Sequence, residues 1–243
     1  MEQFTHTLRP NPQMSAARLA DYMAASEQAR RSIVQSCKYR PTVRVIQHVE
    51  ARAAVTSALL SGSVDVSALK ERANFIRSKI ADSQFESDLN EHNADYVSRF
   101  ADVVPVLDMP KADISAGKSF PDHSINGVRV TFQPDAMLQR ITKTNKVRTG
   151  AVMLRYAKGK ALNAKVASYQ SAFIFGRMTE LADLEIAEPE KKLCAILDAQ
   201  SGVVHEAPGN ANYLYKEMDA ACLAIAERWE AIKPPVGAVV KGT

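Results

Sequence analysis

The spacing of apolar residues changes near Gly127, and this change constrains the fold more than any other feature of the sequence. Before that point, apolar side chains recur every three or four residues, which is the period of an α-helix with one buried face. After it they tend to alternate, which is the period of a strand with one buried face. A helical half followed by a strand-rich half predicts an α+β protein.

The first half is predicted to be helical. Ser15 and Ser26 are typical helix N-caps, because a serine hydroxyl can accept a hydrogen bond from a free amide of the first turn. A run of prolines, glycines and other turn formers separates this half from the strands. The predicted helices cover 16–25, 27–36, 42–60 and 69–100, the last as one helix or as two joined near 81–84.

The second half is predicted to form a mainly antiparallel β-meander, because the loops are short and a parallel pair needs a crossover of about a dozen residues or more. A helix between Pro208 and Pro234 has apolar residues along one face and is expected to pack on the sheet. The predicted strands cover 128–133, 151–156, 164–177, 191–198 and 202–207. The expected organisation is a helical region over 1–102, a linker over 103–126, and an antiparallel sheet domain with a C-terminal helix over 127–243.

The composition favours a globular protein. Apolar residues make up 46% of the chain and charged residues 24%, and these values are close to the averages for folded domains. No stretch approaches the roughly 18 to 20 consecutive apolar residues that cross a bilayer, and the first residues lack the pattern of a signal peptide. Cys37, Cys194 and Cys222 are widely separated, which favours reduced, buried thiols. We therefore expect a cytoplasmic protein with no membrane partner.

Motifs for catalysis are weak. The segment ADISAGKS at 112–119 resembles a phosphate-binding loop, but Ala112 replaces the first glycine and no helix start follows, so we interpret it as a linker. The five histidines and three cysteines show no zinc-ligand spacing. No serine or cysteine lies in a nucleophile motif. The sequence therefore predicts no cofactor.

Two groups of carboxylates leave a metal-dependent nuclease open as an alternative. Glu190 and Lys192, with Asp183 and Glu185 upstream, resemble the D…(D/E)-x-K arrangement of one broad nuclease fold. In that arrangement the acids hold Mg²⁺ and the lysine steadies the attacking water. Asp198, at the end of an apolar strand, resembles the metal-binding acids of ribonuclease-H-like folds. We favour a solvated acidic loop for the first group and a hairpin turn for the second.

Positive charge is concentrated in two acid-free stretches. Residues 139–165 contain eight lysines and arginines, although the whole chain has a net charge of only +4, and residues 28–49 form the second basic stretch. Because charges of both signs usually intersperse on a solvated surface, these stretches predict contacts with phosphates. The predicted contacts are Arg140, Lys143, Lys146, Arg148, Arg155, Lys158 and Lys160, with Arg30, Arg31, Lys38 and Arg40 as a second patch.

The sequence thus predicts a non-catalytic binding protein that holds an anionic partner, DNA or RNA, through a basic hairpin. Tyr156 and Tyr169 are candidates for stacking on unpaired bases. The acidic stretch at 82–95 supports a second interpretation, an assembly module whose acidic helix meets the basic hairpin of another copy to form a homo-oligomer.

Overall fold

The computed structural model describes residues 4–42, 48–121, 123–182 and 187–241, and it has the predicted α+β fold. Its N-terminal segment begins the helical half as expected. The Ser15 hydroxyl accepts a hydrogen bond from the Arg18 amide, and the Ser26 hydroxyl accepts one from the Ala29 amide, so both N-caps are confirmed. The elements of this segment are β1 (His6–Leu8), β2 (Gln13–Ser15), α1 (Ala16–Ala24), α2 (Glu27–Lys38) and β3 (Tyr39–Pro41).

Three helices follow: α3 (Val49–Leu60), α4 (Val66–Arg77) and α5 (Gln84–Val103). The helix predicted over 42–60 is seen from Val49 on, and residues 43–47 lie outside the described residues. The region over 69–100, predicted as one helix or as two joined near 81–84, contains two helices. The Ser83 hydroxyl caps the second by accepting a hydrogen bond from the Glu86 amide. A short 3₁₀ helix, η1 (Val104–Val106), ends this part of the chain.

The main sheet is mixed. Its strands are β4 (Asp113–Ala116), β7 (Ala136–Ile141), β8 (Val147–Arg155), β9 (Glu188–Pro189), β10 (Ala195–Asp198) and β11 (Val203–Glu206). They run in the order β11-β10-β8-β7-β4, with β9 beside β8. The pairs β11–β10, β8–β7 and β7–β4 are antiparallel, whereas β8 is parallel to β10 and to β9. Strand β4 lies inside the segment predicted to be a linker, where it pairs with β7.

The strand predicted over 164–177 is wrong, because this segment forms helix α6 (Ala164–Leu181). Asn163 caps it by accepting hydrogen bonds from the Lys165 and Val166 amides. Since α6 connects β8 to β10, it supplies the crossover that a parallel pair requires, and the predicted meander is interrupted at this point. The 3₁₀ helix η3 (Lys191–Leu193) then leads into β10.

The predicted C-terminal helix is confirmed as α7 (Ala211–Arg228). It packs against α6 and against a small sheet in the order β2-β6-β5, which contains β5 (His123–Ile125) and β6 (Val128–Thr131). A third sheet joins β1 to β3 and to β12 (Val240–Lys241), so the two ends of the described chain lie together. Trp229, directly after α7, is 1% exposed.

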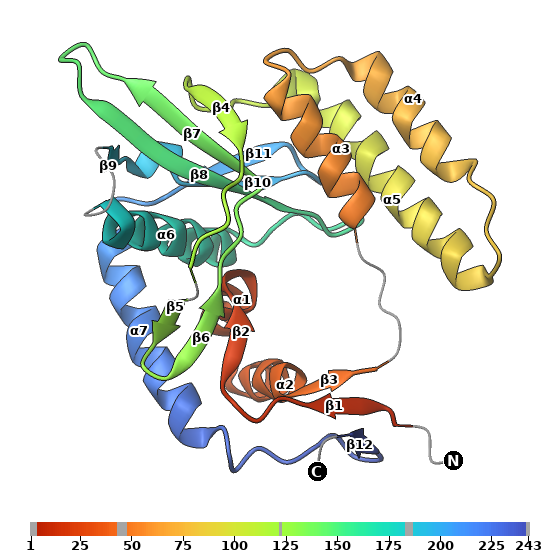
Figure 1. Cartoon of the computed structure of the whole chain (residues 1–243), viewed down its shortest axis with the longest axis vertical. Helices are drawn as coiled ribbons and strands as arrows, with labels where there is room; N and C mark the ends of the chain where they lie inside the picture. Colours follow the sequence, from red (N-terminus) through yellow and green to blue (C-terminus); the bar gives the residue numbers. More distant parts are fainter. Residues whose placement is uncertain (1–3, 43–47, 122, 183–186, 242–243) are drawn as a thin grey trace.

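Two apolar clusters lie on the two faces of the main sheet. Helices α1, α6 and α7 lie on one side of this sheet and helices α3, α4 and α5 on the other (Figure 1). Ala151 and Met153 of β8 contact the cluster that contains α1, α6 and α7, whereas Val152 and Leu154 contact the cluster that contains α3, α4 and α5. This alternation is the strand pattern that the sequence predicts for β8. The three cysteines are buried and free, as expected. None of the helices in the described ranges is long and apolar enough to span a bilayer.

Candidate functional site

The two central parallel strands, β8 and β10, end side by side, with Arg155 opposite Asp198. Helix α6 begins at the same edge, because it carries the chain from one strand to the other. In open sheets that contain parallel strands, ligands commonly bind outside the carboxyl ends of these strands. A cavity of about 390 Å³ lies at this position, and we call it the hollow.

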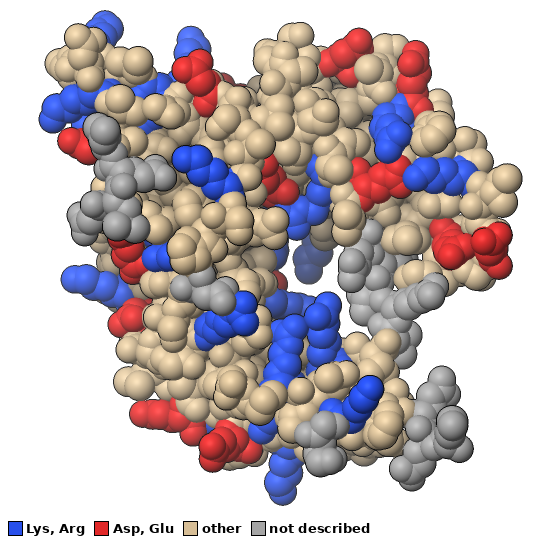
Figure 2. Space-filling model, in the orientation of Figure 1, with Lys and Arg blue, Asp and Glu red and all other residues tan. Residues whose placement is uncertain are grey.

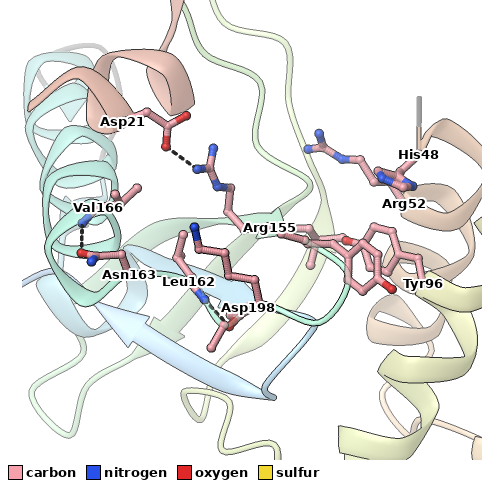
Figure 3. A pocket seen from close by; sticks show the side chains of 14 residues that line it. Asp21, His48, Arg52, Tyr96, Arg155, Leu162, Asn163, Val166 and Asp198 are labelled. Atoms are coloured by element: carbon pink, nitrogen blue, oxygen red, sulfur yellow. Dashed lines mark hydrogen bonds and ion pairs between the residues drawn. The ribbon is translucent and has the colours of Figure 1, made fainter. Parts of the chain in front are cut away.

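Three cationic side chains from separate segments line the hollow: Arg52 from α3, Arg155 from the end of β8, and Lys160 from the loop before α6. Figure 3 shows Arg155 and Asp21 on one side, and His48, Arg52 and Tyr96 on the other. In the space-filling view, lysine and arginine side chains border a recess between the α3–α5 helices and the α1–α2 segment (Figure 2). The hollow is therefore a place where positive charge converges.

Ion pairs hold two of these cations in place. Arg155 donates to the Asp21 carboxylate at 2.6 Å. Arg52 donates to both oxygens of Asp135, at 2.8 and 2.7 Å. Burial lowers the pKa of the Arg52 guanidinium, but its hydrogen bonds to Asp135 outweigh that effect, and the pKa lies above its ordinary value. Lys160 lines the hollow without an ion-pair partner among the described residues.

Asp198 shapes the loop at the hollow. Its buried carboxylate accepts hydrogen bonds from the Leu162 amide at 2.9 Å, the Gln200 amide at 3.0 Å and the Ser201 hydroxyl at 2.5 Å. These bonds tie the loop that carries Lys160 to the turn after β10. In the described part of the chain, no three His, Cys, Asp or Glu side chains form a group that could hold a metal ion.

The other acidic group of interest, Glu190-x-Lys192, lies away from the hollow. Glu190 follows β9 and accepts a hydrogen bond from Arg140 at 2.9 Å. The carboxylates of Asp183 and Glu185 lie outside the described residues. Glu190 therefore has a cation as its partner, which is the arrangement of a structural ion pair.

Two residues that line the hollow carry buried polar atoms without partners. Tyr96 is 1% exposed, and within the described ranges neither its hydroxyl nor Nδ1 of His48 forms a hydrogen bond. Burial raises the pKa of Tyr96 above its ordinary value. Burial, together with the nearby His92 and Arg52, lowers the pKa of His48. Both side chains are therefore neutral at pH 7, and each can donate or accept one further hydrogen bond.

Aromatic rings form one wall of the hollow. Tyr96 and Tyr156 stack with their centroids 4.2 Å apart and their planes 7° from parallel. His48 contacts both rings edge-on, with its centroid 5.5 Å from each. Tyr156 is half-buried, so it is the outer ring of the stack. Tyr169, the other predicted stacking residue, is buried and donates to Glu217 at 2.9 Å instead.

The predicted cations of 139–165 form two groups, one at each end of β8. This strand is nine residues long, so its two ends are roughly 26 Å apart at the usual rise per residue. At the hairpin end, Arg140 pairs with Glu190, while Lys146 and Arg148 pair with Glu188. The hairpin group is Arg140, Lys143, Lys146 and Arg148, and the hollow group is Arg155, Lys158 and Lys160.

Neighbouring acids reduce the charge of both groups. Lys158 pairs with Asp95 of α5, and Arg155 pairs with Asp21. Lys143, at the tip of the hairpin, is exposed and has no ion-pair partner within the described ranges. Among the seven predicted contacts, Lys143 and Lys160 are the lysines without an ion-pair partner in the described part of the chain, and they lie beyond opposite ends of β8.

The second predicted patch is not a single surface. Lys38 is 7% exposed, and its amine donates to the carbonyls of Trp229, Glu230 and Ile232 at 2.7 to 3.0 Å. Arg30 donates to the carbonyls of Tyr22 and Met23 at the end of α1. Arg31 pairs with Glu27, and Arg40 is exposed on β3. Lys38 is therefore a helix-capping residue whose amine faces the protein interior.

Sequence reasoning did not identify three residues of the hollow, namely Arg52, His48 and Tyr96. Arg52 and Tyr96 lie on helices with ordinary patterns, and they reach the hollow only because α3 and α5 pack against the end of the sheet. A comparison with models of known protein families found no match, and a search of curated proteins found no significant relative.

Proposed function

We propose that this protein binds nucleic acid and that the hollow holds part of the phosphate backbone. The observation that carries the proposal is the convergence of Arg52, Arg155 and Lys160 on one cavity beside the N-terminus of an 18-residue helix. Lysine and arginine side chains bind phosphates in proteins, and the partial positive charge at a helix N-terminus favours a nearby anion.

The ion pairs within the hollow are compatible with this role. A guanidinium has five N–H donors, so Arg155 and Arg52 can each hold a carboxylate and still donate to a phosphate. Their pairs with Asp21 and Asp135 also fix the positions of both guanidiniums before a ligand arrives, which lowers the entropic cost of binding.

The hairpin group supports a polymeric partner. It lies roughly 26 Å from the hollow, at the other end of β8, and includes the exposed Lys143. A nucleic acid carries one negative charge per nucleotide, so a single chain can contact both groups. We therefore assign the hollow as the principal contact and the hairpin as a secondary one.

Fluorescence anisotropy with labelled single- and double-stranded DNA and RNA, across a salt series, tests the proposal. We expect Lys160→Glu to weaken binding at least about tenfold and to reduce the slope of log affinity against log salt by about 1 to 2. Lys143→Glu should have a smaller effect. Lys216→Glu, an exposed residue of α7 away from the hollow, is the matched control and should bind like the wild type.

Equal affinity of Lys160→Glu and Lys216→Glu would contradict the assignment of the hollow. Failure of the wild type to bind any oligonucleotide at low salt would contradict the proposal as a whole. If the protein also formed a stable oligomer under those conditions, the assembly interpretation would be favoured.

A further inference from the structure

We infer that the hollow receives a single unpaired nucleotide, with its phosphate beside Arg155 and the start of α6 and its base against the aromatic wall, so that the protein selects single-stranded nucleic acid. This inference rests on the proposed function, because it specifies the strand type that binds at the same site. Four features of the hollow lead to it.

First, the two halves of a nucleotide match the two sides of the hollow. Arg155 and the N-terminus of α6 lie on one side, where Asn163 caps the helix, and the aromatic residues lie on the other (Figure 3). Lys160 adds a cation that no described carboxylate neutralises. Together, these two sides can bind a ligand in which an anionic group is joined at a short distance to a flat aromatic group.

Second, two residues of the aromatic wall carry polar atoms that have no hydrogen-bond partner among the described residues. Buried polar groups almost always have such a partner, so the Tyr96 hydroxyl and Nδ1 of His48, which have none within the described ranges, need an explanation. Both side chains are neutral, and both residues line the hollow. The edge of a nucleobase carries donors and acceptors side by side and could satisfy both groups after a small side-chain adjustment.

Third, the aromatic wall has an outer ring that is available for stacking. Tyr96 supports Tyr156 from the inside at 4.2 Å, which holds the outer ring in a fixed plane. Tyr156 is half-buried and lines the hollow. Every base has a π-face, so stacking on such a ring is strong for unpaired bases and largely independent of sequence.

Fourth, the size of the hollow suits one nucleotide. Its volume of about 390 Å³ is near the lower limit of the range, roughly 300 to 1,000 Å³, that small-molecule pockets occupy. A duplex presents its phosphates outward and keeps its bases paired inside, so only an unpaired or flipped nucleotide can bring a base into the hollow. Arg52 also borders a second cavity of about 580 Å³, through which a strand could continue.

The test uses oligonucleotides that contain 2-aminopurine, a fluorescent base whose emission falls when it stacks. Binding is measured for the single strand, for the same sequence in a duplex, and for free adenosine 5′-monophosphate. We expect the wild type to bind the single strand at least about tenfold more tightly than the duplex, with quenching on binding. The free monophosphate should bind much more weakly than the single strand.

Variants separate the stacking contact from the backbone contact. Tyr156→Ala should weaken single-strand binding about tenfold and abolish the quenching, while duplex binding stays within about twofold. Tyr156→Phe should keep both properties. Tyr96→Phe removes only the unpartnered hydroxyl, so it should weaken single-strand binding without lowering stability. Tyr213→Ala, an exposed tyrosine on α7, is the matched control.

Equal affinity for single strand and duplex, with no effect of Tyr156→Ala or Tyr96→Phe, would overturn this inference and leave the proposed function intact. Equal affinity for the monophosphate and the single strand would overturn it in favour of a small-molecule site. If no nucleic acid bound at any salt concentration, both the inference and the proposed function would fail. If Tyr156→Ala does not fold, the inference is still tested by Tyr96→Phe and by the ratio of the wild-type affinities for single strand and duplex.

Discussion

At the scale of single residues, burial decides what a cation does. Lys38 and Lys160 both belong to acid-free basic stretches, and nothing in their local sequence separates them. In the structure, Lys38 donates to three carbonyls after α7, whereas Lys160 lines the hollow without an ion-pair partner among the described residues. The sequence could predict that these residues carry charge, but not which of them faces inward.

We expect Lys38→Met to lower the free energy of unfolding by about 2 kcal/mol, because it leaves three carbonyls without their charged donor. Urea denaturation followed by circular dichroism measures this loss, and Lys216→Met, on an exposed part of α7, is the control. The folded variant should bind oligonucleotides like the wild type. A Lys38→Met protein of normal stability that no longer binds would instead place Lys38 in the interface.

At the scale of elements, helix α6 shows the limit of periodicity. Every second residue from Ala167 to Phe175 is apolar except Ser171, and this alternation suggested a strand. The helix is buried against the sheet on one side and α7 on the other, so most of its surface is apolar, and periodicity cannot separate helix from strand in such a run. Two features of the sequence indicated a helix here: Asn163 as an N-cap, and the length of the segment. Where a cap preceded an amphipathic run, as at Ser15 and Ser26, the prediction was confirmed.

The contact between α6 and α7 depends on Gly176. A Cβ atom at this position would lie 2.4 Å from Cγ of the Tyr215 ring. We therefore expect Gly176→Ala to destabilise the protein by about 1 to 3 kcal/mol, although alanine favours a helix by about 1 kcal/mol over glycine. Gly209→Ala, where nothing lies within 4 Å, should change stability by less than about 0.5 kcal/mol in the same denaturation experiment. If Gly176→Ala proved as stable as Gly209→Ala, the helices would not be packed this closely.

At the scale of the whole molecule, the fold brings the basic segment next to acids that are distant in the sequence. Arg140 pairs with Glu190, 50 residues away, and Arg155 pairs with Asp21, 134 residues away. Pairs of this kind depend on topology, so most of the charge of a segment that contains no acid in the sequence can be neutralised in the structure. Of the seven cations predicted over 139–165, Arg155 and Lys160 line the hollow, and the fold adds Arg52 and the aromatic residues to them.

The most direct test of the central claim is to locate the contact itself. A single-stranded oligonucleotide that contains 4-thiouridine is bound to the full chain and photo-crosslinked, and the modified peptides are identified by mass spectrometry. We expect the crosslinks to concentrate at Tyr96 and in the segments 154–166 and 48–52, which contain residues that line the hollow, and to disappear with Lys160→Glu. Crosslinks confined to the hairpin at 139–148, or spread over the protein without preference, would contradict the assignment of the hollow as the nucleic-acid site.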